Sequence, residues 1–371
     1  MAESVTEGHP DKLADQIADA LLDEFIKKDP YSRVSIEVMI TTGLIFIAGE
    51  VSAECYVDIP TISKGIVKEA GYTKPEYGFD ADVSAVIISI DEQSPEIAMG
   101  VSGEGAGDTA IVVGYACNES EEYMPLPILI AHRITRKISE LRKTGHYSFI
   151  RPDGKVLVAM EYINGKPSHV KSITAYIHHD PDVKLNDLRE IVVEEVIKKE
   201  VPDELIGKGS SFRVNPSGRF VIGGPVADTG LTGRKIVSDA YGDIGFSGGS
   251  AFSGKDPTKT DRSGSYIARM IAKHVVASGL AEKCVVQIGY TFGVSEPVAF
   301  DIETFGTEKI EKEKIISIVR KVFPLRPMEI IEFLDLRKPI YRSTSCYGHF
   351  GKAHLPWEKL SHIEKIKELV E

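Results

Sequence analysis

A helix, a two-stranded hairpin and a second helix recur three times along this chain, and this recurrence constrains the fold more than any other feature. Apolar residues at helical spacing predict the first helix of each repeat at 11–28, 125–143 and 263–277. Paired β-rich runs predict hairpins at 34–51, 156–177 and 285–304. The second helices are expected at 61–71, 185–199 and 311–322. Hairpins with helices on one face form an α+β fold, here three similar units with sheets packed together and helices outside.

The length of 371 residues exceeds what one hydrophobic core usually supports, so the chain should divide into domains. Glycines cluster between positions 100 and 107, behind Ser94-Pro95, which is typical of a mobile loop and a boundary. The predicted units are an N-terminal α+β domain (1–95), a gate loop (96–108), a central domain (109–222) and a C-terminal domain (223–371).

Charge and cysteine content exclude several functional classes. A net charge of −11 disfavours nucleic-acid binding, because the concentrated basic loops are small and suit a small anion better. Four widely spaced cysteines without a Cys-x-x-Cys motif favour reduced thiols in the cytoplasm over a zinc site or disulfides. The sequence has no apolar run of about 18 residues, so no membrane span is predicted.

The stretch 248–263 combines glycine and serine with three basic residues and two aspartates, which predicts a polyphosphate site with its metal. Residues 249–255 fit the first seven positions of a P-loop. The eighth position is Asp256 rather than Ser or Thr, and Pro257 disfavours the helix that a P-loop needs there. A flexible surface loop is the alternative without chemistry.

Three further motifs carry candidate functional residues, and each has a structural alternative. In 7–12, His9 and Asp11 precede a helix, where the dipole favours an anion; alternatively Asp11 is an N-cap and His9 a surface residue. The Pro-Asp-Gly sequence within 151–155 is also ordinary turn chemistry. The segment 218–235 offers Phe220 for stacking and Arg234 and Lys235 for phosphates, or it is a glycine-rich linker.

Five motifs in order along the chain together resemble the S-adenosylmethionine synthetase (methionine adenosyltransferase) family. They are Glu-Gly-His-Pro-Asp-Lys at 7–12, Gly-Glu-Gly-Ala-Gly-Asp at 103–108, the segment 223–235, the glycine-rich segment 249–256, and Tyr-Gly-His-Phe-Gly at 347–351. The resemblance implies three α+β domains with pseudo-threefold symmetry. It also implies that the protein joins ATP and L-methionine into S-adenosylmethionine and then cleaves tripolyphosphate to phosphate and diphosphate.

The resemblance also assigns roles to individual residues. The cofactors it implies are two Mg²⁺ per site, held by Asp11 and Asp261, and one K⁺ per subunit, held by Glu37. The methionine-binding residues are expected to be Glu50, Gln93, Asp108, Asp228 and Lys259. The ATP-binding residues are expected to be His9, Asp153, Lys155, Arg219, Phe220, Asp228, Arg234, Lys235, Ala251 and Lys255. The catalytic residues are expected to be His9, Lys155, Arg234, Lys235, Lys255 and Lys259.

Methionine sulfur is already a fair nucleophile, so this reaction needs alignment and charge neutralisation rather than a nucleophile-and-base pair. The competing hypotheses are a P-loop phosphotransferase and a non-catalytic nucleotide-binding protein. The resemblance further implies a homodimer with shared active sites, commonly paired into a homotetramer. In that arrangement we expect Glu50 of one subunit to meet ATP held by His9 and Lys255 of the other.

Overall fold

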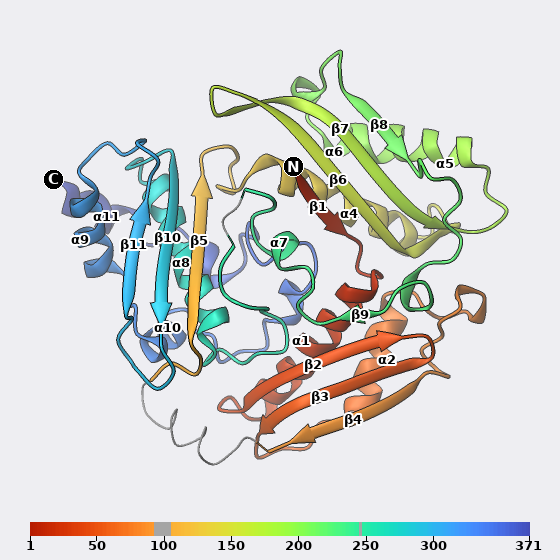
Figure 1. Cartoon of the computed structure of the whole chain (residues 1–371), viewed down its shortest axis with the longest axis horizontal. Helices are drawn as coiled ribbons and strands as arrows, with labels where there is room; N and C mark the ends of the chain where they lie inside the picture. Colours follow the sequence, from red (N-terminus) through yellow and green to blue (C-terminus); the bar gives the residue numbers. More distant parts are fainter. Residues whose placement is uncertain (93–104, 245–246) are drawn as a thin grey trace.

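The computed structural model describes residues 1–92, 105–244 and 247–371. Its strands are β1 Ala2–Val5, β2 Arg33–Thr41, β3 Leu44–Ser52, β4 Ala85–Asp91, β5 Ala110–Cys117, β6 Ile150–Ile163, β7 Lys166–His179, β8 Ser211–Val214, β9 Gly230–Leu231, β10 Lys283–Tyr290 and β11 Ala299–Glu303. They form three separate sheets, each built on one of the expected hairpins (Figure 1). The predicted three-unit α+β class and its hairpins are therefore confirmed.

The three sheets repeat one topology. Their orders are β9-β2-β3-β4, β1-β6-β7-β8 and β5-β10-β11. In each order, the strand named first pairs antiparallel to the first strand of the hairpin. In the first two sheets, a strand parallel to the hairpin's second strand completes the order.

Each sheet contains one strand that another of the three predicted units supplies. The predicted N-terminal unit contributes β1 to the sheet of β6 and β7. The central unit contributes β5 to the sheet of β10 and β11, and the C-terminal unit contributes β9 to the sheet of β2 and β3. The three units are therefore tied together in a cycle of exchanged strands, which the hairpin pattern did not predict.

The helices are α1 Pro10–Lys28, α2 Ile59–Glu69, α4 Leu126–Lys143, α5 Leu185–Ile191, α6 Lys198–Glu200, α7 Ile236–Asp239, α8 Thr260–Ala277, α9 Lys312–Val322, α10 Pro327–Phe333 and α11 Ile363–Val370. Not all helices lie outside as expected. Nearly every residue of α8, and most of α1, is buried. These two helices form the interior because elements from more than one unit pack around them, and their polar residues have buried partners there.

Two expected helical features differ in detail. Thr61 was expected to cap α2, but the helix begins at Ile59 and its N-cap is Asp58, whose carboxylate accepts the backbone N–H of Thr61. The single helix expected at 185–199 contains a π-helical segment, Val192–Ile197, between α5 and α6. None of the helices in the described part of the chain combines the length and apolar composition that crossing a bilayer requires.

Candidate active site between helix α1 and the edge of strand β2

The two glycine-rich segments lie along one edge of β2. Ile36 donates its backbone N–H to the carbonyl of Gly254 at 2.9 Å, and Asp256 donates to the carbonyl of Val34 at 3.0 Å. Further along the same strand, Thr232 donates to the carbonyl of Val38 at 3.0 Å. Gly254 has φ +81°, and a Cβ there would lie 2.0 Å from the Ile36 oxygen, so only glycine permits this approach.

Helix α1 holds the same segments from the other side through three aspartates at four-residue spacing. Asp11 Oδ1 accepts the backbone N–H of Leu231 at 3.1 Å, and Asp15 Oδ1 accepts that of Gly233 at 2.9 Å. Asp19 Oδ1 accepts that of Gly254 at 2.9 Å. Residues four apart lie on one helix face, so a single stripe of carboxylates positions both loops.

His9 is the N-cap of α1 and is buried. Its Nδ1 accepts the backbone N–H of Asp11 at 3.2 Å, which leaves Nε2 as the ring's N–H donor. Burial, with Lys235, Lys155 and Lys12 as further causes, lowers the pKa of His9 to about 3. His9 is therefore a neutral hydrogen-bond donor at physiological pH.

Four further charged residues surround His9. Asp11 pairs with Lys235 at 2.6 Å, and Arg234 Nε lies 3.7 Å from Asp11. Burial opposes ionisation of Asp11, but Lys235 more than compensates and lowers its pKa. Lys155 pairs with Glu3 at 3.2 Å. We call His9, Asp11, Lys155, Arg234 and Lys235 the helix-end group.

Asp153 and Phe220 lie beside the helix-end group. Asp153 is buried and accepts the backbone N–H of Gly224 at 2.8 Å. Burial raises the pKa of Asp153 to about 6, and Asp228 adds to this rise while Lys155 opposes it. The ring of Phe220 lies 5.2 Å from that of His178, centroid to centroid. Arg219 is exposed and donates to the carbonyl of Pro181.

A second cluster forms at the start of α8. Lys255 pairs with Asp261 at 2.9 Å, and Asp261 also accepts the backbone N–H of Ser250 at 2.8 Å. Burial and the adjacent Asp261 carboxylate raise the pKa of Asp108. Lys255 also lies close enough to Glu37 to oppose the rise that burial causes in the pKa of Glu37. We call Glu37, Asp108, Lys255 and Asp261 the glycine-loop group.

The remaining predicted residues have varied settings. Lys259 is buried and paired with Asp256 at 2.7 Å, so its charge already has a structural partner. Ala251 lies against Gly233, where an added Cβ would meet the Ala251 Cβ at 2.3 Å. Asp228 is exposed. Gln93 and most of the expected gate loop, 96–104, lie outside the described residues.

The register of the first sheet brings Glu50 and Lys255 of one chain close together. In the register of β2 and β3, Glu50 is opposite Ser35, and Ser35 is in turn bridged to Lys255. Directly paired residues point to the same sheet face, and neighbouring strands are about 4.8 Å apart. Glu50 and Lys255 of one chain therefore lie on the same face and only two strand spacings apart.

The structure removes several of the alternatives left open by the sequence. Lys255 does not begin a helix, because α8 starts at Thr260, so the segment lacks P-loop architecture. The N-cap of α1 is His9 rather than Asp11, and His9 is not a surface residue. Residues 151–155 belong to β6 rather than to a turn.

Sequence reasoning missed the residues that support the site. Asp15 and Asp19 hold the glycine-rich segments, Lys12 joins Asp15 to Asp239, and Arg262 contacts Asp19 at 2.7 Å. The four-residue spacing of aspartates on an otherwise buried helix was the available signal. Isolated surface carboxylates at this spacing would look the same in the sequence.

The carboxylates present suit hard cations. Asp108 and Asp261 adjoin each other, and a divalent ion would relieve their mutual repulsion. Within the described residues, no cluster of three or more His, Cys, Asp or Glu side chains could hold a metal. Mg²⁺ is commonly bound by one or two carboxylates together with substrate phosphates, so Asp11 and Asp261 fit such a site.

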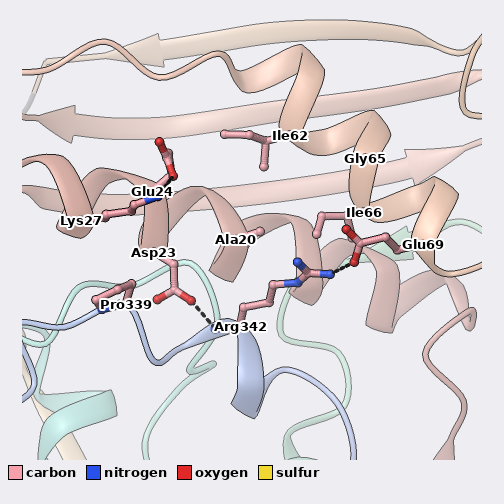
Figure 2. A pocket seen from close by; sticks show the side chains of 10 residues that line it. All are labelled: Ala20, Asp23, Glu24, Lys27, Ile62, Gly65, Ile66, Glu69, Pro339 and Arg342. Atoms are coloured by element: carbon pink, nitrogen blue, oxygen red, sulfur yellow. Dashed lines mark hydrogen bonds and ion pairs between the residues drawn. The ribbon is translucent and has the colours of Figure 1, made fainter.

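Two cavities help to locate the chemistry. One of about 330 Å³ lies between α1, α2 and residues 339–342 and includes none of the predicted site residues (Figure 2). There Asp23 accepts the backbone N–H of Arg342, and the Arg342 side chain pairs with Glu69. A second cavity, of about 440 Å³, is lined by Arg234 and Lys235 and suits a phosphate chain better.

Comparison with known proteins accounts for almost the whole chain. The models of the N-terminal, central and C-terminal domains of S-adenosylmethionine synthetase match residues 1–95, 103–220 and 222–359. S-adenosylmethionine synthase of Aquifex aeolicus is 72% identical over 371 residues, covering 100% of this chain and 99% of the relative. The synthases of Desulforudis audaxviator and Thermus thermophilus are each 50% identical over 382 residues, covering 99% of this chain and 97% of each relative.

Proposed function

This chain belongs to the S-adenosylmethionine synthetase family, and from that premise we propose that it makes S-adenosyl-L-methionine by attack of the methionine sulfur on C5′ of ATP. The S–C5′ bond forms as the C5′–O5′ bond breaks, and tripolyphosphate leaves. We further propose that the enzyme hydrolyses the tripolyphosphate to phosphate and diphosphate before release. The carrying observation is the helix-end group, where cations and a neutral histidine donor converge on α1.

The helix-end group supports a leaving-group role. Lys235, Arg234 and Lys155 supply positive charge for the polyphosphate, and Nε2–H of His9 is the donor for O5′ as it becomes anionic. Asp153 binds the backbone of Gly224, close to Phe220, on which the adenine would stack, with Arg219 at its rim. Ala251 and Lys255 would line the phosphate end.

Two Mg²⁺ ions per site and one K⁺ per subunit complete the proposal. Asp11 and Asp261 would each hold Mg²⁺, which supplies positive charge to the phosphate oxygens when bound. Glu37 would hold K⁺. Burial raises the pKa of Glu37 and so disfavours its ionised form, which a bound cation would favour. Glu50, Gln93, Asp108, Asp228 and Lys259 would bind methionine, beneath a gate at 96–108.

We propose a homodimer, paired into a homotetramer, in which each active site combines the helix-end group of one subunit with the glycine-loop group of the other. Among the described residues, no ion pair or side-chain hydrogen bond joins the two groups within one chain. The face that bears Glu37 also carries the half-exposed Ile87. A second copy would cover this apolar face through an isologous contact.

Mixed dimers test this division. Lys235→Ala and Lys255→Ala should each be inactive alone, whereas each mixed dimer should regain about half of the normal sites, by two-fold symmetry. Random exchange of equal amounts makes about half of the dimers mixed, so the whole mixture should regain about a quarter of the normal sites. Lys235→Ala mixed with Asp11→Ala is the control, because both lesions lie in the helix-end group and every site stays damaged. Lack of recovery in proven mixed dimers of the first pair would place both groups in one subunit's site.

A product assay tests the reaction itself. With ATP and L-methionine we expect S-adenosylmethionine, phosphate and diphosphate in equal amounts, with stimulation by K⁺. Release of ADP would instead support a phosphotransferase, and binding of ATP without products would support a nucleotide-binding protein.

We place the enzyme in the cytoplasm, in keeping with four free cysteine thiols.

A further inference from the structure

A basic cavity outside the proposed active site lies where α4 meets residues 343–354. Its volume is about 530 Å³, and its basic lining residues are Arg136, Lys352 and His354. The other lining residues are Ser343, Cys346, Tyr347, Gly351 and Ala353. Thus, in the described part of the chain, this cavity has basic walls and no carboxylate, on a protein whose net charge is −11.

Lys352 is held in this cavity by carbonyl groups. Its Nζ donates to the carbonyl oxygen of Ser343 at 2.7 Å and to that of Cys346 at 2.6 Å. Two of the three ammonium N–H groups are thereby used, and the third is left for another acceptor. The side chain is fixed without a carboxylate counter-ion among the described residues.

The surroundings of Lys352 disfavour its protonated form. Burial is the main reason that the pKa of Lys352 is lowered to about 7. Cys346 and Asp239 oppose this fall, while Arg136 and Lys12 contribute to it. The two nearby histidines, His132 and His349, are buried, and their pKa values are well below the usual range, so both are neutral. A bound anion would favour the charged form of Lys352.

Arg136 is oriented by an aromatic ring. Its guanidinium carbon lies 5.4 Å from the ring centroid of Tyr347, and the Tyr347 hydroxyl donates to Ser139 at 2.8 Å, which fixes the ring. No ion pair of Arg136 is present among the described residues, whereas Lys137, the next residue on α4, pairs with Glu140. Stacked guanidinium groups keep their N–H edge for an oxyanion.

We propose that the Arg136–Lys352 cavity is a second anion site, which binds a phosphate group between the Arg136 guanidinium and the Lys352 ammonium. Phosphate offers several acceptor oxygens, which the planar fork of arginine and the single point of lysine can share. The group is inorganic phosphate or the phosphate of a small monoester, because the cavity is wide enough for either. The site is separate from the residues proposed to bind ATP.

Acylation of Lys352 reports occupancy directly. The full-length enzyme, with its active site saturated by a non-hydrolysable ATP analogue and methionine, would be treated with a small amine-acylating reagent at pH 7. Peptide mass spectrometry would give the labelling rate of each lysine in phosphate and in chloride of equal ionic strength. We expect phosphate at twice its dissociation constant to slow Lys352 about threefold, by mass action, and to leave Lys137 unchanged.

The same labelling with glycerol 3-phosphate in place of inorganic phosphate distinguishes the two ligands. Protection of Lys352 at a lower concentration of glycerol 3-phosphate assigns the site to phosphate monoesters. Protection at a lower concentration of inorganic phosphate assigns it to the free ion. Arg136→Met should abolish protection, whereas the matched Lys137→Met should keep it. Equal labelling of wild-type Lys352 in phosphate and chloride would overturn the proposal, even if Arg136→Met failed to fold. Full protection in a folded Arg136→Met variant would overturn it as well.

Discussion

His9 combines two duties that its geometry makes compatible. Its Nδ1 caps α1 by accepting the N–H of Asp11, and the same bond leaves Nε2 protonated and directed to other partners. Because burial beside cations keeps the ring neutral, the proton at Nε2 persists without a positive charge that the neighbouring lysines would repel. The capping bond thus selects the tautomer that the proposed chemistry requires.

Replacement of this histidine should affect the chemical step more than binding. Asparagine is also a good N-cap, so His9→Asn should fold normally but should lack the donor at the Nε2 position. We expect kcat to fall by about 10²–10³-fold, the usual cost of one oxyanion donor, with little change in KM for methionine. Steady-state kinetics would show this split, and a kcat within twofold of wild type would contradict the role. Since the pKa is about 3, the ratio of the two kcat values should stay constant from pH 5 to 9.

Asp23 offers a test of stability against pH. It accepts backbone N–H groups of Tyr341 at 2.9 Å and Arg342 at 2.8 Å, beside the cavity of Figure 2. Burial raises its pKa to about 6, against an ordinary value of 3.8, and the two N–H bonds oppose that rise. The folded state therefore binds more protons than the unfolded state between these values, so the contribution of Asp23 to stability falls as pH rises from 4 to 6.

The variant Asp23→Asn should remove this dependence. We compare the free energy of unfolding of the wild-type protein with that of the variant at each pH. This difference should be roughly 1–3 kcal/mol more favourable to the wild type at pH 4 than at pH 7, since the pKa shift is about two units. Urea denaturation of both proteins across this range provides the comparison, with the neighbouring Glu24→Gln as control. A wild-type-to-variant difference that is the same at every pH would show that Asp23 keeps an ordinary pKa.

At the scale of elements, helix α8 joins the proposed site to the C-terminal tail. Its first turn carries Asp261, while further along Arg269 and Lys273 bind the buried Glu358, at 3.0 and 2.7 Å. Trp357 is fully buried beside this pair and stacks on Tyr266, with ring centroids 3.7 Å apart. The tail is therefore a structural brace for the helix that presents the glycine-loop group.

Breaking this brace should be costly. Glu358→Gln leaves two buried cations without a counter-ion, and removal of one partner from such a network typically costs about 3–5 kcal/mol. Chemical denaturation should detect the loss, and limited proteolysis should release the tail more readily. Glu364→Gln is the matched control, because Glu364 pairs with Lys367 on the exposed surface, where we expect less than about 1 kcal/mol. Equal stability of the two variants would refute the bracing role.

Elements with local signals were predictable from the sequence, and elements that depend on distant partners were not. The i+4 spacing of Leu13, Ile17, Leu21 and Phe25 is sufficient to identify α1, and its apolar face is buried as that spacing predicts. By contrast, β1 and β9 are too short to show periodicity, and they are strands only because β6 and β2 offer free edges. The motifs identified candidate residues, but the closeness of Glu50 and Lys255 within one chain became apparent only from the register of β2.

At the scale of the whole molecule, the cyclic exchange of β1, β5 and β9 makes the three units interdependent. A fragment cut at the unit boundaries predicted from the sequence lacks the strand that another unit supplies. The stretch 109–222 on its own, for example, would expose the edge of β6 that β1 covers, because Ala2 pairs there with Val158. Unpaired edges of this kind promote association with other chains.

Fragments should behave accordingly. We expect 109–222 expressed alone to be aggregation-prone, and the same fragment with residues 1–8 joined through a flexible linker to be more soluble and to show slower amide exchange in β6. A scrambled 1–8 segment on the same linker is the control. If the unmodified fragment is monomeric and protected in β6, the borrowed strand is not needed for the central unit.

The exchange of strands also bears on how the protein emerges from the ribosome. Roughly 190 residues separate the end of β2, at Thr41, from the start of β9, at Gly230. At about 5–20 residues per second, the nascent N-terminal sheet waits about 10–40 s for the segment that completes its edge. During that interval the proposed nucleotide site has neither its glycine-rich walls nor the partners of its buried carboxylates. The order of translation therefore makes activity a late event, and it makes the unfinished edge of β2 a natural place for a chaperone to bind.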